Sequence, residues 1–341
     1  MAAREKDQHF HILVIALLIG ALFLSVIISF MLGRYSVGLR ELFGIMFSKL
    51  MPIDSFWSEQ MEIVVFNIRM PRILMACLVG CCLAAAGAAY QGVFQNPMAA
   101  PDILGASSGA AFGAALAILL GASNRMIMAA AFFSSLITVG LVYAISLRTK
   151  GNKVIGLILS GIMVGSLFSA GTSFIKLVAD PSNQLPAITY WLMGSLSGTT
   201  KKDLALAAFP MAIGLLGLFI LRWRINILTL GDDEAKTIGV NTNLVRLSVI
   251  VCSTLITAAS VSVSGMIGWV GLVIPHLARK IIGNNYRYLI PASMIFGAIF
   301  LLIVDNISRN LLAIEIPLGI LTAFVGAPFF IYLITRKGET L

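Results

Sequence analysis

The sequence predicts an all-α, polytopic membrane protein of about ten transmembrane helices, with both termini on the cytoplasmic side. Only 11% of the 341 residues are charged, 59% are hydrophobic, and the mean hydropathy is +0.96. Soluble domains carry about 25% charged residues, so lipid is the solvent that suits this surface. Nine long stretches lack Asp, Glu, Lys and Arg, as spanning helices do. We expect residues 1–341 to form one transmembrane domain.

The predicted spans follow from these uncharged stretches. The first, 8–33, follows Arg4 and Lys6 as in a signal peptide, but it has no small-residue cleavage pattern, so we expect a retained helix. The stretch 247–278 is too long for one helix. It divides at a Ser- and Gly-containing run into a span, 247–263, and a short helix, 266–279, which brings the total to ten. The other predicted spans are 73–101, 103–124, 126–147, 154–175, 204–221, 288–304 and 316–335.

The segment 178–202 is predicted to be an outer loop. Its uncharged part, 181–200, contains Pro181, Pro186 and several polar residues, which fits an extramembrane loop or a short surface helix rather than a span. An even number of spans places both termini on one side. With the N-terminus inside, a modest majority of the 24 Lys and Arg residues falls on cytoplasmic segments, as the positive-inside rule requires.

Several functions are disfavoured. The net charge of +9 is dispersed singly between apolar runs, so it builds no nucleic-acid-binding stripe. The chain has no phosphate-binding Gly-x-x-x-x-Gly-Lys-Ser/Thr loop and no nucleophile–base pair, so we expect neither ATP binding nor enzymatic activity. The four cysteines lie in apolar runs without metal-ligand spacing and are interpreted as small buried side chains. We predict no cofactor and no metal site in this chain.

The absence of charged residues from these stretches disfavours a carrier coupled to ions or protons. Carriers coupled to ions or protons usually place Asp, Glu or Lys within a span. We therefore expect a path lined by hydroxyls, amides and apolar side chains rather than by charge. From the residues alone, a carrier or channel that works without ATP and a membrane scaffold or sensor both remain open.

Motifs spread over most of the chain narrow the choice. They are Arg69-Met-Pro-Arg72, Gly87 to Gly105 with its Gln-Asn-Pro-Met-Ala-Ala-Pro-Asp-Ile-Leu-Gly ending, Leu230 to Gly239, Gly268 to Arg279, Asp305 to Arg309, Glu315 to Gly319, and Gly326-Ala-Pro328. Their order resembles the FecCD-type permeases of ABC importers. The resemblance implies a translocation subunit for a metal chelate, with an iron–siderophore favoured and haem, cobalamin or a molybdate-type oxyanion as alternatives.

The same resemblance implies partners. They are a second copy or a paralogous permease, two ATP-binding subunits that hold ATP and Mg²⁺, and an extracytoplasmic substrate-binding protein. The expected location is the prokaryotic plasma (inner) membrane, where the chain is multi-pass and contacts lipid but no nucleic acid.

Residues 228–240 are the predicted coupling loop to the ATPase. Three acidic residues open a short polar helix, where they favour the positive end of the helix dipole. A polar helix protruding into the cytoplasm gives a soluble ATPase a surface to grip, and the resemblance assigns coupling to this loop. The residues predicted to carry it are Gly231, Asp232, Asp233, Glu234, Ala235 and Gly239.

Arg69, Arg72 and Arg309 fall on the outer face, where the resemblance implies that they receive acidic residues of the binding protein. Asp305, four residues before Arg309, is expected to neutralise it in part.

The resemblance also implies a cytoplasmic gate. It comprises Asn96 and Met98, beside the helix-breaking Pro97 and Pro101, together with Val154 and Ile155. Some family members have small hydroxylic residues at the last two positions, so this gate is expected to be more apolar and to close by dewetting.

Overall fold

A computed structural model describes residues 2–49, 51, 54–151 and 153–335, and this part of the chain is helical without strands. The elements, in chain order, are α1 (Ala2–Met31), α2 (Leu39–Phe47), α3 (Glu59–Ile63), the π-helix η1 (Val64–Arg69), α4 (Met70–Val93), α5 (Ala106–Leu119), α6 (Asn124–Ser146), α7 (Lys153–Val178), α8 (Gln184–Met193), α9 (Lys201–Leu228), α10 (Asp232–Thr237), α11 (Thr242–Ser264), α12 (Val270–Ile282), α13 (Tyr286–Asn310) and α14 (Leu318–Thr335).

Seven helices in the described residues are long and apolar enough to cross a membrane. They are α1, α3–α4 as one continuous helix, α6, α7, α9, α11 and α13. The three other predicted spans also form helices, but shorter ones: α5 has 14 residues, α12 has 13 and α14 has 18. At 1.5 Å per residue, α5 and α12 extend only about 20 Å, less than the roughly 30 Å of a bilayer core. The chain is therefore a multi-pass membrane protein in which some helices traverse part of the membrane.

Several helix ends that were predicted from the uncharged stretches differ from those in the structure. The predicted start at residue 73 is wrong, because one continuous helix runs from Glu59 to Val93 and includes Arg69 and Arg72. The predicted end at residue 101 is also wrong, because α4 stops at Val93 and a non-helical segment, 94–105, follows. Pro97 and Pro101 lack the N–H that a continuing helix needs, and Gly105 has a left-handed φ of 78°. Residues 181–200 contain the short helix α8, one of the two predicted options.

The segment 94–105 turns back into the bundle (the re-entrant segment). A Cβ on Gly271 would lie 2.2 Å from the Pro101 ring and 2.7 Å from the Leu83 carbonyl oxygen, so Pro101 packs beside the middle of α4. Leu83 lies ten residues before the end of α4, which corresponds to about 15 Å. On the other side, Gly161 of α7 faces the carbonyl oxygen of Ile103. The re-entrant segment thus reaches about halfway through the bilayer before α5 begins.

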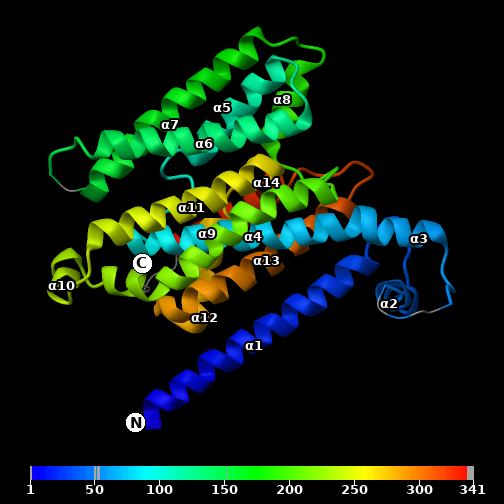
Figure 1. The fold of residues 1–341 in the computed structure, drawn as a ribbon, viewed down its shortest axis with the longest axis horizontal. Coiled ribbons are helices and arrows are strands. Elements are labelled where there is room, and N and C mark those ends of the chain that lie inside the picture. Colours follow the sequence, from blue (N-terminus) through cyan, green and yellow to red (C-terminus); the bar gives the residue numbers. More distant parts are fainter. Residues whose placement is uncertain (1, 50, 52–53, 152, 336–341) are drawn as a thin grey trace.

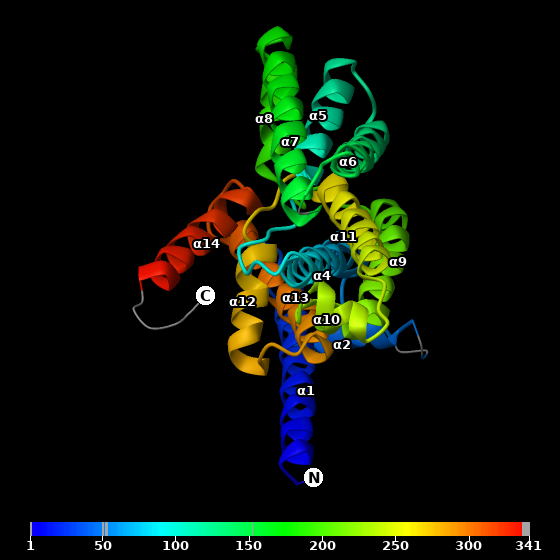
Figure 2. The same ribbon diagram turned by 90° about the vertical axis from the view of Figure 1, so that its left-hand side faces the viewer.

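Helix α4 is the centre of the bundle and packs against α9, α11, α12 and α13. Figures 1 and 2 show it surrounded by these helices. Two crossings depend on paired glycines: Gly80 faces the backbone of Gly297 in α13, and Gly87 faces the backbone of Gly271 in α12. Small residues permit such close backbone approach between helices in lipid.

Helices α5 to α8 form a second group, at the top of both views, which packs on α11 mainly through α5 and α6. Helix α1 lies at the opposite edge and packs mainly on α13. The start of α1 and helix α10 lie at one end of the bundle, whereas α2 and α3 lie at the other (Figure 1). This arrangement agrees with the predicted placement of the N-terminus and the coupling loop on one side.

Candidate functional site

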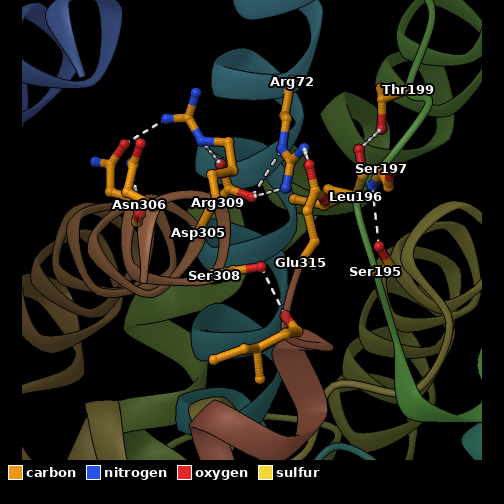
Figure 3. Close-up of polar contacts among 12 residues, drawn as sticks. Arg72, Ser195, Leu196, Ser197, Thr199, Asp305, Asn306, Ser308, Arg309 and Glu315 are labelled. Carbon is orange, nitrogen blue, oxygen red and sulfur yellow. Dashed lines mark hydrogen bonds and ion pairs between the residues drawn. The ribbon is translucent and has the colours of Figure 1, made fainter. Parts of the chain in front are cut away.

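Three of the predicted site residues meet in one buried cluster at the end of the bundle near α3. Figure 3 shows Arg72 of α4 and Arg309 of α13 on either side of Asp305, with Glu315 next to Arg72. The Nε and Nη2 atoms of Arg72 both lie 2.9 Å from Asp305 Oδ1, and its Nη1 atom lies 2.8 Å from Glu315 Oε1. Arg309 Nε lies 3.1 Å from Asp305 Oδ2. Asp305 thus neutralises two arginines, including the predicted partner four residues on.

Arg69 completes the cluster from the last position of η1. Its guanidinium group donates to the backbone carbonyls of Phe30 and Tyr35, after the end of α1. Arg309 also donates to Asn306 Oδ1, which accepts from Ser29 Oγ of α1. These contacts fasten the outer end of α1 to α4 and α13.

In this outer cluster, the three arginines and Asp305 are hidden from solvent, whereas the Glu315 side chain is 29% exposed. The exposed fractions are 4% for Arg69, 8% for Arg72, 9% for Arg309 and 0% for Asp305. The three arginines were expected to be available to a partner protein. In the structure, however, their guanidinium groups already contact groups of this chain. Sequence reasoning missed Glu315 as a partner of Arg72, although the Glu-Ile-Pro-Leu-Gly motif contains it.

Glu315 lies in the connection between α13 and α14. Burial raises its pKa, but the hydrogen bond and positive charge of Arg72 outweigh this effect, so the pKa of Glu315 lies below its usual value. The carboxylate is therefore ionised at neutral pH. The same connection is joined to the outer loop, because the Leu318 N–H donates to the Gly194 carbonyl at 2.8 Å.

At the opposite end, the predicted polar helix is present as α10. Gly231 precedes it with a φ of 121°, which a side chain would strain, and Gly239 ends it with a φ of 84°. Asp232 forms an ion pair with Arg246 of α11, in which Oδ1 lies 2.8 Å from Nη2, and Ala235 is fully buried. Asp233 pairs with Lys236 at 3.0 Å on the exposed side, where Glu234 also lies. Helix α10 is thus fixed to the bundle by one face and presents the other to solvent.

Gln95 connects the base of α10 with the re-entrant segment. Its Nε2 atom donates to the carbonyl of Leu228, the last residue of α9, at 2.6 Å. Gln95 has a φ of +49°, a conformation uncommon for a residue with a side chain. Gln95 directly precedes the gate residue Asn96, and Leu228 lies three residues before Gly231, so the hydrogen bond joins the two predicted sites. Sequence reasoning missed Gln95, because a lone glutamine carries no spacing signal.

The predicted gate residues occupy two elements. Asn96 Oδ1 accepts from the Met98 N–H at 2.9 Å, so this part of the segment forms a side-chain-stabilised turn, and Met98 is exposed. Val154 and Ile155 lie in the first turn of α7; Val154 packs on the main core and Ile155 is exposed. The re-entrant segment and α7 meet deeper in the bundle, where Gly161 faces Ile103.

A cavity of about 710 Å³ opens between α14, the end of α8, the start of α5 and the connection before α12. In Figure 2, α14 lies at the left of the bundle and α8 at its top. Among the described residues, Asp102 is the one charged residue that lines the cavity; Ser107, Trp269 and Phe324 line it too. Neither this cavity nor any other place among the described residues contains three or more His, Cys, Asp or Glu side chains grouped so that they could hold a metal ion.

Comparison with known proteins agrees with the motif order. The model of the FecCD transport family matches residues 7–336. The chain belongs to the FecCD transport family.

Several FecCD-type relatives match over most of their length. The molybdate import system permease of Haemophilus influenzae is 38% identical over 93% of this chain and 94% of its own length. A probable iron chelatin permease of Helicobacter pylori is 41% identical over 82% and 84%. A solved structure described as an inward-facing ABC transporter of metal-chelate type is 37% identical, with a TM-score of 0.84 over 94% of this chain and 98% of that one.

Proposed function

We propose that this chain is the translocation subunit of an ABC importer that carries a metal chelate, with an iron–siderophore as the favoured cargo. Membership of the FecCD transport family supports this proposal, as do relatives named for iron chelatin and for hemin. The observation that carries it is α10, a polar helix with no role in spanning the membrane that stands at one end of the bundle on a fixed base. Molybdate remains a second candidate cargo because a molybdate permease matches nearly end to end.

In the proposed assembly, two permeases, either identical or paralogous, enclose the path. Each contacts one ATPase subunit that holds ATP and Mg²⁺, and the complex resides in the prokaryotic plasma membrane. The ATPase contacts α10 through Asp233, Glu234 and the exposed apolar residues Leu230 and Ile238, which flank the helix. Arg246 and Ala235 hold α10 to the bundle, so that a pull on the helix moves α9 and α11 rather than α10 alone.

The outer cluster is proposed to receive the binding protein. Its three arginines and two acidic residues leave one net positive charge, which favours an acidic partner and sets orientation and association rate more than affinity. Arg34 adds an exposed positive charge nearby and donates to the carbonyls of Leu312 and Ala313. The internal pairing of Arg72 and Arg309 keeps their groups in fixed positions, so docking requires no reordering of these side chains.

Reconstitution tests the proposed function. Liposomes containing the permease, its ATPase and its binding protein should accumulate a ferric siderophore only when ATP is present, and the binding protein should stimulate ATP hydrolysis. Accumulation by the permease alone would identify an ATP-independent carrier instead. Chelate binding without flux under either condition would favour a scaffold or sensor.

We expect Gln95 to transmit movement from α10 to the gate formed by Asn96, Met98, Val154 and Ile155. Gln95→Ala removes the donor to Leu228 and should reduce transport per ATP hydrolysed about two- to thirty-fold, the range of coupling changes of ~0.5–2 kcal/mol. ATP hydrolysis without binding protein should persist. The measurement is the ratio of chelate accumulated to phosphate released.

Gln60→Ala provides a matched control for the Gln95 prediction, because Gln60 is exposed in α3 at the far end of the bundle. An unchanged ratio in Gln95→Ala, with Gln60→Ala also unchanged, would exclude this connection as the transmission element.

A further inference from the structure

Asp102 occupies an unusual place for a carboxylate. It follows Pro101 in the re-entrant segment, and Pro101 packs against Gly271 and the carbonyl of Leu83, about 15 Å from the inner end of α4. This position is about halfway through a bilayer core of roughly 30 Å. An ionisable side chain at such depth costs several kcal/mol and usually serves a ligand or ion path.

In the part of the chain that the structure describes, the internal partner of the carboxylate is its own backbone. Asp102 is exposed, and no ion pair joins it to a Lys or Arg in the described ranges. The contrast with Asp305 is direct, since Asp305 is fully buried and bound to two arginines. Asp102 therefore is not a structural counterion, and it lines the cavity.

The surroundings define what the carboxylate can bind. Trp269 and Phe324 line the same cavity, as does Ser107, and the remaining lining side chains are uncharged. A carboxylate beside aromatic rings is the arrangement that recognises an ammonium or related cation, through a charge-assisted hydrogen bond and cation–π attraction. The same carboxylate repels an oxyanion or a chelate with peripheral carboxylates.

We propose that Asp102 is a specificity residue of the translocation path and that the imported chelates carry a positive charge of ammonium type on their surface. This inference rests on the proposed transport function and adds the charge of the cargo to it. It also disfavours free molybdate as cargo, because the oxyanion would meet a carboxylate in each permease of the pair.

Trp269 allows a test that requires neither the binding protein nor transport. In the purified permease in lipid nanodiscs, Trp57, Trp191 and Trp223 are replaced by Phe so that Trp269 is the single indole of the protein. Quenching of its fluorescence is titrated with ferrioxamine B, a ferric hydroxamate with a free ammonium group. The matched probe is its N-acetyl derivative, which keeps the ferric centre and lacks the charge.

Ferrioxamine B should bind about tenfold more tightly than the acetylated probe, the difference expected for one hydrogen bond to a charged group. Asp102→Asn should abolish this preference, and Asp54→Asn, at an exposed outer position, should retain it. If the two probes bind with equal affinity before Asp102 is replaced, the proposal is wrong, and the Asp102→Asn variant is not needed to show it. A preference that persists in Asp102→Asn would also overturn it.

The two proposals fail separately in these experiments. If the reconstituted importer accumulates no chelate under any condition, the transport function is wrong whatever the fluorescence shows. If it accumulates an anionic ferric chelate as well as ferrioxamine B, and the probes bind equally, the transport function stands and the role of Asp102 does not.

Discussion

Asp305→Ala should destabilise the folded chain by about 3–5 kcal/mol, because it leaves buried guanidinium groups without their counterion. Asp305 is fully buried and bridges Arg72 and Arg309. Glu315 remains beside Arg72, but Arg309 loses its one ion-pair partner in the described residues. The measurement is the thermal unfolding of the purified protein in lipid nanodiscs, followed by intrinsic fluorescence.

The exposed pair between Lys49 and Glu62 supplies the control. Its side chains are 60% and 35% exposed at a separation of 2.6 Å, so Glu62→Ala should change stability by no more than ~1 kcal/mol. The double variant Asp305→Ala with Arg309→Ala should recover part of the loss, because it also removes the uncompensated charge. Equal stability of Asp305→Ala and Glu62→Ala would contradict the role assigned to the outer cluster.

Gly87→Ala is expected to have the second large effect. A Cβ at this position would lie 1.7 Å from the carbonyl oxygen of Gly271 and 2.5 Å from its carbonyl carbon, and these atoms belong to backbone that no rotamer change can move. Overpacking a core costs about 1–3 kcal/mol, and rigid backbone on both sides places this substitution near ~3 kcal/mol. Because Gly271 also contacts Pro101, the re-entrant segment should shift and transport should be lost.

Gly140→Ala is the matched substitution, made in α6 where a Cβ would meet no atom within 4 Å. Alanine forms helices better than glycine by about 1 kcal/mol, so this variant should be as stable as the parent or more so. The pair is compared by thermal unfolding and by ATP-driven chelate uptake. Wild-type uptake by Gly87→Ala would show that α4 and α12 do not depend on this contact.

Much of the fold follows from the distribution of charge along the chain. Each predicted span contains a helix, and the polar helix α10 appears where acidic residues open the coupling loop. The Asp305–Arg309 pair, four residues apart, is confirmed, because spacing along a helix is readable from sequence. The roles of the docking, coupling and gate residues stay predictions.

The remainder depends on contacts between distant residues. The helix start at Glu59 differs from prediction because Arg69 and Arg72 lie inside the helix. Arg72 pairs with carboxylates more than 200 positions away, and Arg69 donates to the carbonyls of Phe30 and Tyr35. Asp102 separates the predicted spans 73–101 and 103–124, yet the proline-containing segment carries it to mid-depth. Helix α5 likewise has 14 residues where the longer span 103–124 was expected, whereas α12, with 13 residues, has about the length of the short helix predicted at 266–279.

The outer cluster also imposes an order on synthesis. Arg72 and Asp305 are 233 positions apart, and at ~5–20 residues per second the ribosome needs roughly 10–50 s to pass from one to the other. During this interval α4 has to enter the membrane with unneutralised arginines, so water or the insertion machinery must shelter them. A nascent chain truncated before α13 would keep Arg72 without either of its carboxylate partners, Asp305 and Glu315.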